Sequence, residues 1–220
     1  RVIITENIKS ELAIALSESD HDRLFVLVDE CTKEKCWNKI KVFYSLKNAH
    51  VITIKPADSN KTLESISHVW KELGNNGGTR HSCLVNLGGG MVTDLGGFAA
   101  STFKRGINFI NIPTTLLSMV DASVGGKTGI NFNGLKNEIG TFCNANFVLL
   151  CTDFLTTLDS ANLLSGYAEM LKHGLISNID MLAGLLNFDV CHIQDKEQRL
   201  QLSRMISDSV EVKKNIVEKD

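Results

Sequence analysis

The chain shows two successive patterns of apolar and polar positions, and the pattern changes near residue 152. Before it, short apolar runs predict strands at residues 2–4, 24–28, 51–54, 84–87, 107–112 and 146–150. Apolar residues at helical spacing lie between these runs, most clearly at residues 63–73, where Gly74 predicts the end of a helix. Strands that alternate with helices favour an α/β fold, with a mostly parallel sheet and helices on both faces.

After residue 152 the pattern is helical. The segment NLLSGYAEMLKHGLI is compatible with a helix despite Gly166, and the last segment has one largely apolar side. We therefore expect a Rossmann-like nucleotide-binding domain over residues 1–152 and the beginning of an all-α domain over residues 153–220. Because the chain starts at Arg1 without methionine and its last helices have unpartnered apolar faces, we expect a piece of a longer protein, with the helical domain truncated at Asp220.

Composition excludes several classes of protein. Apolar residues make up 43% of the chain, charged residues 22%, and the net charge is −2, so nothing indicates a nucleic-acid-binding surface. No run approaches the roughly 18 apolar residues of a membrane span, and no signal-peptide pattern is present. Six cysteines form no disulfide framework, and Cys31 and Cys36 resemble a metal pair only weakly. Reduced thiols indicate a cytoplasmic protein.

The stretch from Cys83 to Gly140 holds eleven of the seventeen glycines. An apolar run enters the triple glycine 88–90 and a helix-compatible run leaves it, which predicts a strand, a tight turn and a helix N-terminus that suit a phosphate-bearing ligand. The motif GGGMVTD is neither the dinucleotide fingerprint nor a P-loop, so tight-turn geometry alone is the alternative. Asp94 could cap the helix or accept hydrogen bonds from ligand hydroxyls. Asp29, just past a strand, could hold the ribose or adenine side of a nucleotide, or cap a turn.

Three cations in this part of the chain indicate an anionic ligand. Lys127 follows two glycines in SVGGKTG and Lys136 precedes Asn137, and we expect both lysines in glycine-rich loops. Arg105 lies in the turn KRG. Solvated loop lysines and a surface arginine are the alternatives. Further along, Glu169 and His173 are four residues apart on one predicted helix and could face one metal ion, or could belong to an ordinary polar helix face.

Four segments resemble the 3-dehydroquinate synthases of the sugar-phosphate cyclase group: GGGMVTDLGGFAA, KRGINFINIPTTLLSMVDASVGGKTGIN, LKNEIGTF and LTTL with SGYAEMLKHG. The similarity runs from about Leu24 to Asp220. It implies a lyase with two domains and the site in the cleft between them. It also implies NAD and a divalent metal as cofactors, zinc first and cobalt as the alternative. The implied reaction turns a phosphorylated sugar acid, 3-deoxy-D-arabino-heptulosonate 7-phosphate, into 3-dehydroquinate and phosphate in the shikimate pathway, within a cytoplasmic homodimer.

The resemblance also implies roles for individual residues. Arg105 (offered across the dimer interface), Lys127, Asn137 and Lys172 match catalytic and substrate-binding positions, and Glu169 matches a metal ligand. The positions that match NAD contacts are Asp29, Asp58, Lys61, Gly88, Gly89, Gly90, Asp94, Thr114, Thr115, Asp121, Lys127, Lys136 and Thr157.

Several positions depart from the family pattern. Thr93 stands where relatives usually have glycine, so we expect a different local turn. Ala57 and Asp58 replace a usual Gly-Glu pair, and Asp159 stands where proline is frequent. His173 lies at a variable position, and the other two metal-binding histidines of the family lie beyond Asp220.

We therefore expect the chain alone to be inactive and to bind NAD weakly or not at all. The alternatives are another sugar-phosphate cyclase (2-deoxy-scyllo-inosose synthase-like), a metal-dependent polyol dehydrogenase and a non-catalytic nucleotide-binding module.

Overall fold

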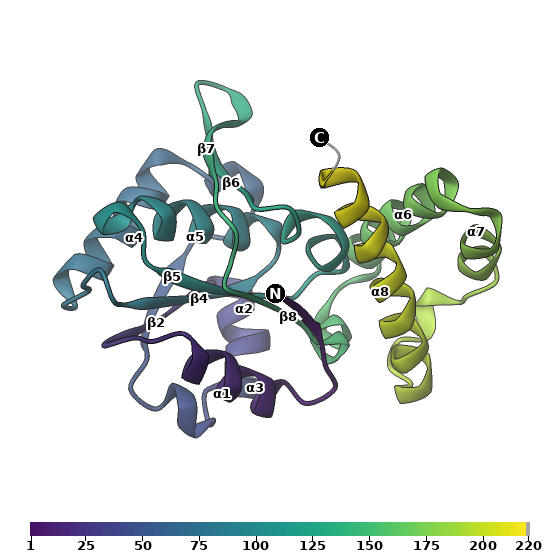
Figure 1. Cartoon of the computed structure of the whole chain (residues 1–220), viewed down its shortest axis with the longest axis horizontal. Helices are drawn as coiled ribbons and strands as arrows, with labels where there is room; N and C mark the ends of the chain where they lie inside the picture. Colours follow the sequence, from purple (N-terminus) through teal and green to yellow (C-terminus); the bar gives the residue numbers. More distant parts are fainter. Residues whose placement is uncertain (219–220) are drawn as a thin grey trace.

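The computed structural model describes residues 1–218, and its centre is a six-stranded sheet in which every neighbouring pair of strands is parallel (Figure 1). The order across the sheet is β1-β8-β5-β4-β2-β3. The strands are β1 (Val2–Ile4), β2 (Leu24–Asp29), β3 (His50–Ile54), β4 (Cys83–Gly88), β5 (Asn108–Pro113) and β8 (Phe147–Leu150). All six coincide with the apolar runs, and the predicted α/β fold is confirmed.

Helices cover both faces of this sheet, because alternate strand residues point to opposite sides. On one face α4 (Leu63–Asn75) and α5 (Gly90–Thr102) pack on Phe25 and Leu27 of β2. On the other face α1 (Ile8–Glu18) and the short helices α2 (Glu30–Thr32), η1 (Lys33–Trp37) and α3 (Asn38–Ile40) lie beneath the sheet (Figure 1). Helix α4 ends one residue beyond the predicted Gly74.

The strand order reverses at β2. The chain passes from β2 to β3 on one side and then returns, so that β4 pairs with the other side of β2. In open parallel sheets a ligand crevice forms at the carboxyl ends of the strands where the order reverses. Here those ends are Asp29 and Gly88.

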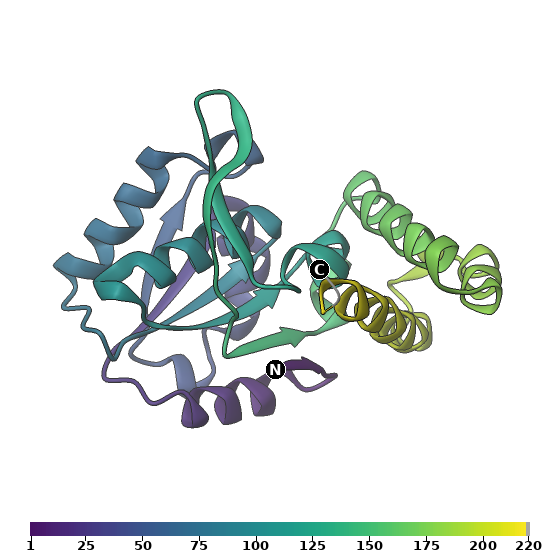
Figure 2. The same ribbon diagram turned by 45° about the horizontal axis from the view of Figure 1, so that its top comes forward.

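A hairpin that the sequence analysis treated as glycine-rich loops projects from the sheet (Figures 1 and 2). Its strands are β6 (Lys127–Phe132) and β7 (Leu135–Phe142), which pair antiparallel. The turn between them uses Asn133 and Gly134, with φ angles of 50° and 78°. Asn-Gly adopts this left-handed two-residue turn readily, which explains the hairpin. The loop prediction for Lys127 and Lys136 is therefore wrong, since both lie on strands.

The helices that follow β8 lie to one side of the sheet (Figure 2). They are η6 (Thr152–Thr157), α6 (Ser160–Ser177), α7 (Ile179–Leu186) and α8 (Lys196–Val217). Asp159, the departure from proline, caps α6 by accepting a 2.9 Å hydrogen bond from the Asn162 N–H. None of the helices in the described part of the chain combines the length and apolarity that crossing a membrane requires.

Gly166 explains how α6 reaches the sheet. A Cβ added there would lie 2.4 Å from the backbone nitrogen of Leu117 and 2.6 Å from Cβ of Leu116. The missing side chain lets α6 approach the segment that leads into the π-helix η5 (Ser118–Ala122). Two carboxylate side chains, those of Glu169 on α6 and Asp121 on η5, are thereby brought close together.

Candidate functional site

Two adjoining cavities open at the carboxyl ends of the strands. The first has a volume of about 610 Å³ and lies at the strand-order reversal, and the second has about 470 Å³ and is lined in part by the hairpin. Ten of the residues assigned to NAD line the first cavity: Asp29, Asp58, Lys61, Gly89, Gly90, Asp94, Thr114, Thr115, Lys136 and Thr157. Asp121, Lys127 and Asn137 line the second cavity, and Asp94 lines both.

The triple glycine shapes the floor of the first cavity. Strand β4 ends at Gly88, Gly89 is the N-cap of α5, and no side chain caps the helix. A Cβ on Gly88 would lie 2.5 Å from Val92, and one on Gly89 would lie 3.0 Å from Thr115. Gly89, Gly90 and Met91 line the first cavity, so the N-terminus of α5 lies at this cavity, as helix N-termini do in sites that bind phosphate.

Thr93 does not change this turn. It lies inside α5, is 2% exposed, and donates a 3.1 Å hydrogen bond from Oγ1 to the Gly90 carbonyl. It is not among the residues with positive φ, so no glycine is needed there. The physical reason for expecting a different turn, a positive φ at this position, therefore does not apply to Thr93.

Lys61 is the buried cation of the first cavity. Its Nζ donates a 2.9 Å hydrogen bond to Asp94 Oδ2, donates another to Asn137 Oδ1, and lies 3.6 Å from Asp58 Oδ1. Burial raises the pKa of Asp94, and the charge of Lys61 opposes that shift. Asp94 therefore does not cap the helix, since it lies one turn inside α5 and pairs with Lys61.

Asp58 and Asp29 each have a partner on the protein. Burial alone would raise the pKa of Asp58, but the hydrogen bond from Lys136 and the charge of Lys61 outweigh it, so the pKa is lowered. Asp58 Oδ2 is 3.0 Å from Lys136 Nζ. Asp29 caps α2, because its Oδ1 accepts a 2.7 Å hydrogen bond from the Thr32 N–H. The capping alternative for Asp29 is thus observed, while its carboxylate still lines the first cavity.

The second cavity brings cations and carboxylates together. Lys127 and Lys213 line it together with Asp94 and Asp121, and Lys213 forms an ion pair with Asp121. The sequence analysis missed Lys213. The available signal was a charged residue on the apolar side of the last helix, one turn beyond the buried Ser209 and Val210.

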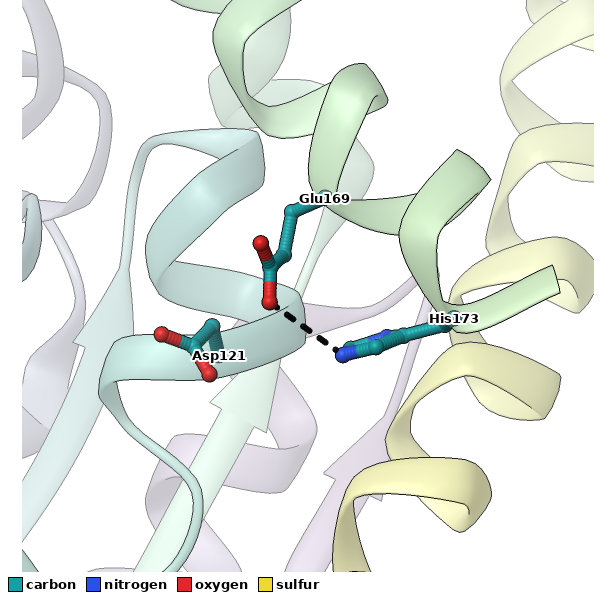
Figure 3. A group of neighbouring side chains, drawn as sticks. All are labelled: Asp121, Glu169 and His173. Atoms are coloured by element: carbon teal, nitrogen blue, oxygen red, sulfur yellow. Dashed lines mark ion pairs between the residues drawn. The ribbon is translucent and has the colours of Figure 1, made fainter. Parts of the chain in front are cut away.

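A cluster of Asp121, Glu169 and His173 lies beside the second cavity (Figure 3). One ligand atom from each lies within 4.8 Å of the others. His173 is 1% exposed, its Nδ1 lies 2.6 Å from Ser209 Oγ, and its Nε2 lies 3.4 Å from Glu169 Oε1. Burial lowers the pKa of His173, although the Glu169 carboxylate opposes this, so the imidazole favours its neutral form.

This set of atoms fits a divalent metal. Carboxylate oxygens and a neutral imidazole nitrogen are ligands that zinc and cobalt accept, and three protein ligands with an open position are typical of catalytic zinc sites. The spacing of Glu169 and His173 had suggested a metal pair, and the resemblance had left Glu169 alone as a ligand. The structure brings both residues together and adds Asp121, which the sequence analysis had assigned to NAD.

Other predicted site residues lie outside both cavities. Arg105 is exposed on the turn Phe103–Arg105, where Lys104, Arg105 and Gly106 all have positive φ. Lys172 is exposed and forms an ion pair with Glu169. Gly88 lies under the first cavity without lining it. All six cysteines are free, and within residues 1–218 Cys31 and Cys36 belong to no potential metal cluster.

A family model described as 3-dehydroquinate synthase N-terminal matches residues 51–165, which is more than half of the chain. The 3-dehydroquinate synthase of Parabacteroides distasonis is 50% identical over 220 residues, covering 100% of this chain and 61% of that protein. That of Clostridium tetani is 36% identical over 201 residues, covering 91% of this chain and 53% of that protein. The chain therefore spans somewhat more than half the length of the curated relatives it matches.

Two solved structures are similar along nearly the whole chain. A 2-epi-5-epi-valiolone synthase from Streptomyces hygroscopicus with NAD+ and Zn2+ bound has a TM-score of 0.85 and 27% identity, covering 96% of this chain and 59% of that one. A 2-deoxy-scyllo-inosose synthase complexed with carbaglucose-6-phosphate, NAD+ and Co2+ has a TM-score of 0.83 and 21% identity, covering 98% and 60%. The second similarity shows the fold alone.

Proposed function

This chain belongs to the 3-dehydroquinate synthase family, and on that premise we propose that its full-length protein is a carbon–oxygen lyase. The proposed reaction converts 3-deoxy-D-arabino-heptulosonate 7-phosphate to 3-dehydroquinate and inorganic phosphate, with NAD regenerated in each turnover. The protein would act in the shikimate pathway to aromatic amino acids, as a cytoplasmic homodimer. The division into an α/β domain over residues 1–152 and the start of a helical domain over residues 153–220 belongs to the same proposal.

One observation carries this proposal: a cavity lined by ten residues assigned to NAD adjoins a second cavity that contains lysines and lies beside a metal-compatible cluster. The first cavity, with the N-terminus of α5 at its floor, is assigned to NAD. The second, with Lys127 and Lys213, is assigned to the sugar acid phosphate. The cluster of Asp121, Glu169 and His173 is assigned to the metal.

The residues of this chain would hold and orient the reacting groups. When bound, NAD supplies reversible hydride transfer and the divalent metal polarises the oxygen of the oxidised carbon. Lys127 and Lys213 would balance the charges of the phosphate and carboxylate groups. Asn137 would offer its amide N–H groups to the substrate, since its oxygen accepts from Lys61. Phosphate leaves with the electron pair of its C–O bond as the neighbouring carbon loses a proton.

Arg105 would complete the site of a second subunit. It is exposed and lines neither cavity, and it lies in a turn of three consecutive residues with positive φ. An arginine in such a position suits a contact with a phosphorylated ligand in a neighbouring copy. Lys172, beside Glu169, would reach the substrate from the metal side.

The test is phosphate release by the full-length protein, with and without NAD and a divalent metal. Removing either cofactor should abolish phosphate release. Lys127→Met should lower kcat/KM by about 10- to 100-fold, the effect of one lost charge-assisted hydrogen bond. Lys71→Met, which removes an exposed lysine on α4, is the matched control and should leave kcat/KM unchanged. Absence of phosphate release from the fully loaded wild-type protein would refute the proposal.

A second candidate rests on the fold shared with 2-deoxy-scyllo-inosose synthase. A protein of that kind would release phosphate from glucose 6-phosphate and not from the heptulosonate phosphate. Assays with both substrates separate the two functions. Accumulation of NADH in proportion to product would instead indicate a polyol dehydrogenase.

A further inference from the structure

Asn131 joins the hairpin to the loop that precedes α4. The register of β6 and β7 shifts between Ile130 and Phe132, so Asn131 lies at a bulge. Bulges redirect a side chain out of the regular alternation of a strand. Asn131 is half-buried and lines neither cavity, so it does not meet a ligand directly.

Four hydrogen bonds fix this asparagine. Its backbone N–H donates to the Lys61 carbonyl at 2.8 Å. Its side-chain Nδ2 donates to the Asp58 carbonyl at 2.9 Å and, more weakly, to Asp58 Oδ2 at 3.4 Å. Its Oδ1 accepts from the Asn137 N–H at 2.9 Å. Donor and acceptor sides of a single amide therefore connect the loop before α4 with strand β7.

The partner on β7 needs such support. Asn137 has a φ of 54°, a left-handed conformation that is uncommon outside glycine, although asparagine adopts it more readily than most residues. Its backbone N–H donates to Asn131 Oδ1 and its own Oδ1 accepts from Lys61 Nζ, which leaves its side-chain Nδ2 for a ligand. Asn137 lines the second cavity and the preceding Lys136 lines the first.

We propose that Asn131 is a positioning residue, which holds Asn137 toward the substrate and couples that orientation to the loop on the NAD side. The inference rests on the proposed function, which assigns the two cavities to substrate and NAD. The side-chain oxygen of Asn131 orients Asn137, and its side-chain nitrogen orients Asp58. An Asn131 that serves only to stabilise the hairpin would change the free energy of unfolding and leave both ligand affinities unchanged.

The experiment compares Asn131→Ala, Asn131→Asp and the wild type in the full-length protein. Asn131→Ala removes both functions, so KM for the heptulosonate phosphate should rise about tenfold, the effect of one hydrogen bond of ordinary strength. Asn131→Asp keeps the acceptor for Asn137 but removes the donor to Asp58. Its KM for the heptulosonate phosphate should therefore lie between those of Asn131→Ala and the wild type, while its Kd for NAD stays above the wild-type value. Asn133→Gly is the matched control, because Asn133 is an exposed asparagine at the tip of the same hairpin with a φ that glycine accepts.

A ligand-free measurement separates this inference from the proposed function. Hydrogen–deuterium exchange in Asn131→Ala should speed up both in peptides that contain Asn137 and in peptides that contain Asp58–Lys61, whereas Asn133→Gly should affect only the tip. Unchanged exchange at Asp58–Lys61 would overturn the coupling. Unchanged KM and Kd in an active Asn131→Ala protein, with only a lower melting temperature, would overturn the positioning role. Should the alanine variant fail to fold, a KM and Kd for Asn131→Asp equal to those of the wild type would overturn it as well.

Discussion

Ala57 is held in a backbone conformation that glycine adopts far more easily, and Ala57→Gly should stabilise the protein. Its φ of 78° and ψ of 146° lie near a region that is occupied almost only by glycine. The residue precedes the turn Asp58–Asn60, at a position where the family resemblance implies glycine. Its carbonyl accepts a 3.0 Å hydrogen bond from the Asn60 N–H, which the substitution leaves in place.

The magnitude follows from two opposing terms. Relief of the strained conformation contributes about 1–3 kcal/mol. The greater freedom of glycine in the unfolded chain offsets about 0.4–1 kcal/mol of this. The net stabilisation should be about 0.5–2 kcal/mol, and each kcal/mol raises the melting temperature by about 2–4 °C in a domain of this size.

Urea unfolding of the full-length protein measures the change, with Ala13→Gly as the matched control. Ala13 is exposed in the middle of α1, where glycine should cost about 0.5–1 kcal/mol. The two alanine-to-glycine changes are therefore expected to have opposite signs. A loss of stability in Ala57→Gly equal to that in Ala13→Gly would refute the strained conformation at Ala57.

Three further substitutions test buried polar contacts. Lys61→Met removes the charge that opposes the raised pKa of Asp94. A carboxyl group whose pKa is raised in the folded state contributes stability that is fully present below its ordinary pKa. This stability is lost as the pH rises through the pKa of the folded state. The stability deficit of Lys61→Met in urea unfolding should therefore grow from about pH 4 upward, relative to Lys71→Met. Tyr167→Phe removes the 2.6 Å hydrogen bond to the Leu185 carbonyl, which keeps a 3.2 Å hydrogen bond from the Phe188 N–H, and should cost about 0.5–1.5 kcal/mol, whereas the exposed Tyr44→Phe should cost nothing measurable. Ser209→Ala removes the partner of His173 Nδ1 and should weaken metal binding by about 10- to 100-fold in a chelator competition, with the exposed Ser207→Ala as control.

The main sheet was predictable from the sequence because buried parallel strands leave continuous apolar runs. All six residues of β2 and of β4 are buried. The hairpin was missed for the opposite reason, since seven of the eight residues of β7 are exposed and give no alternation of apolar and polar positions. The dipeptide Asn133-Gly134 was the usable signal, because it is a strong indicator of a two-residue hairpin turn.

Contacts between distant segments are the part of the site that could not be predicted from the sequence. The glycine loop and the lysines could be assigned from local patterns and the resemblance. The partners of Lys61 lie 33 and 76 residues away, and Lys213 meets Asp121 across 92 residues. No periodicity in the sequence carries such information, so the bonding of Lys61 and the placement of Lys213 required the fold.

Some of the site lysines already form ion pairs with a protein carboxylate, whereas within the described residues Lys127 does not. Lys61, Lys136 and Lys213 each have a carboxylate partner, in Asp94, Asp58 and Asp121. An anionic ligand that binds to one of these lysines must compete with that carboxylate, which lowers the gain from the new contact. Lys127 is exposed, lines the second cavity and has no acidic partner within residues 1–218. Of the two lysines that line the second cavity, Lys127 is therefore the one that a phosphate group can meet without displacing a protein carboxylate, and its loss should weaken substrate binding more than the loss of Lys213.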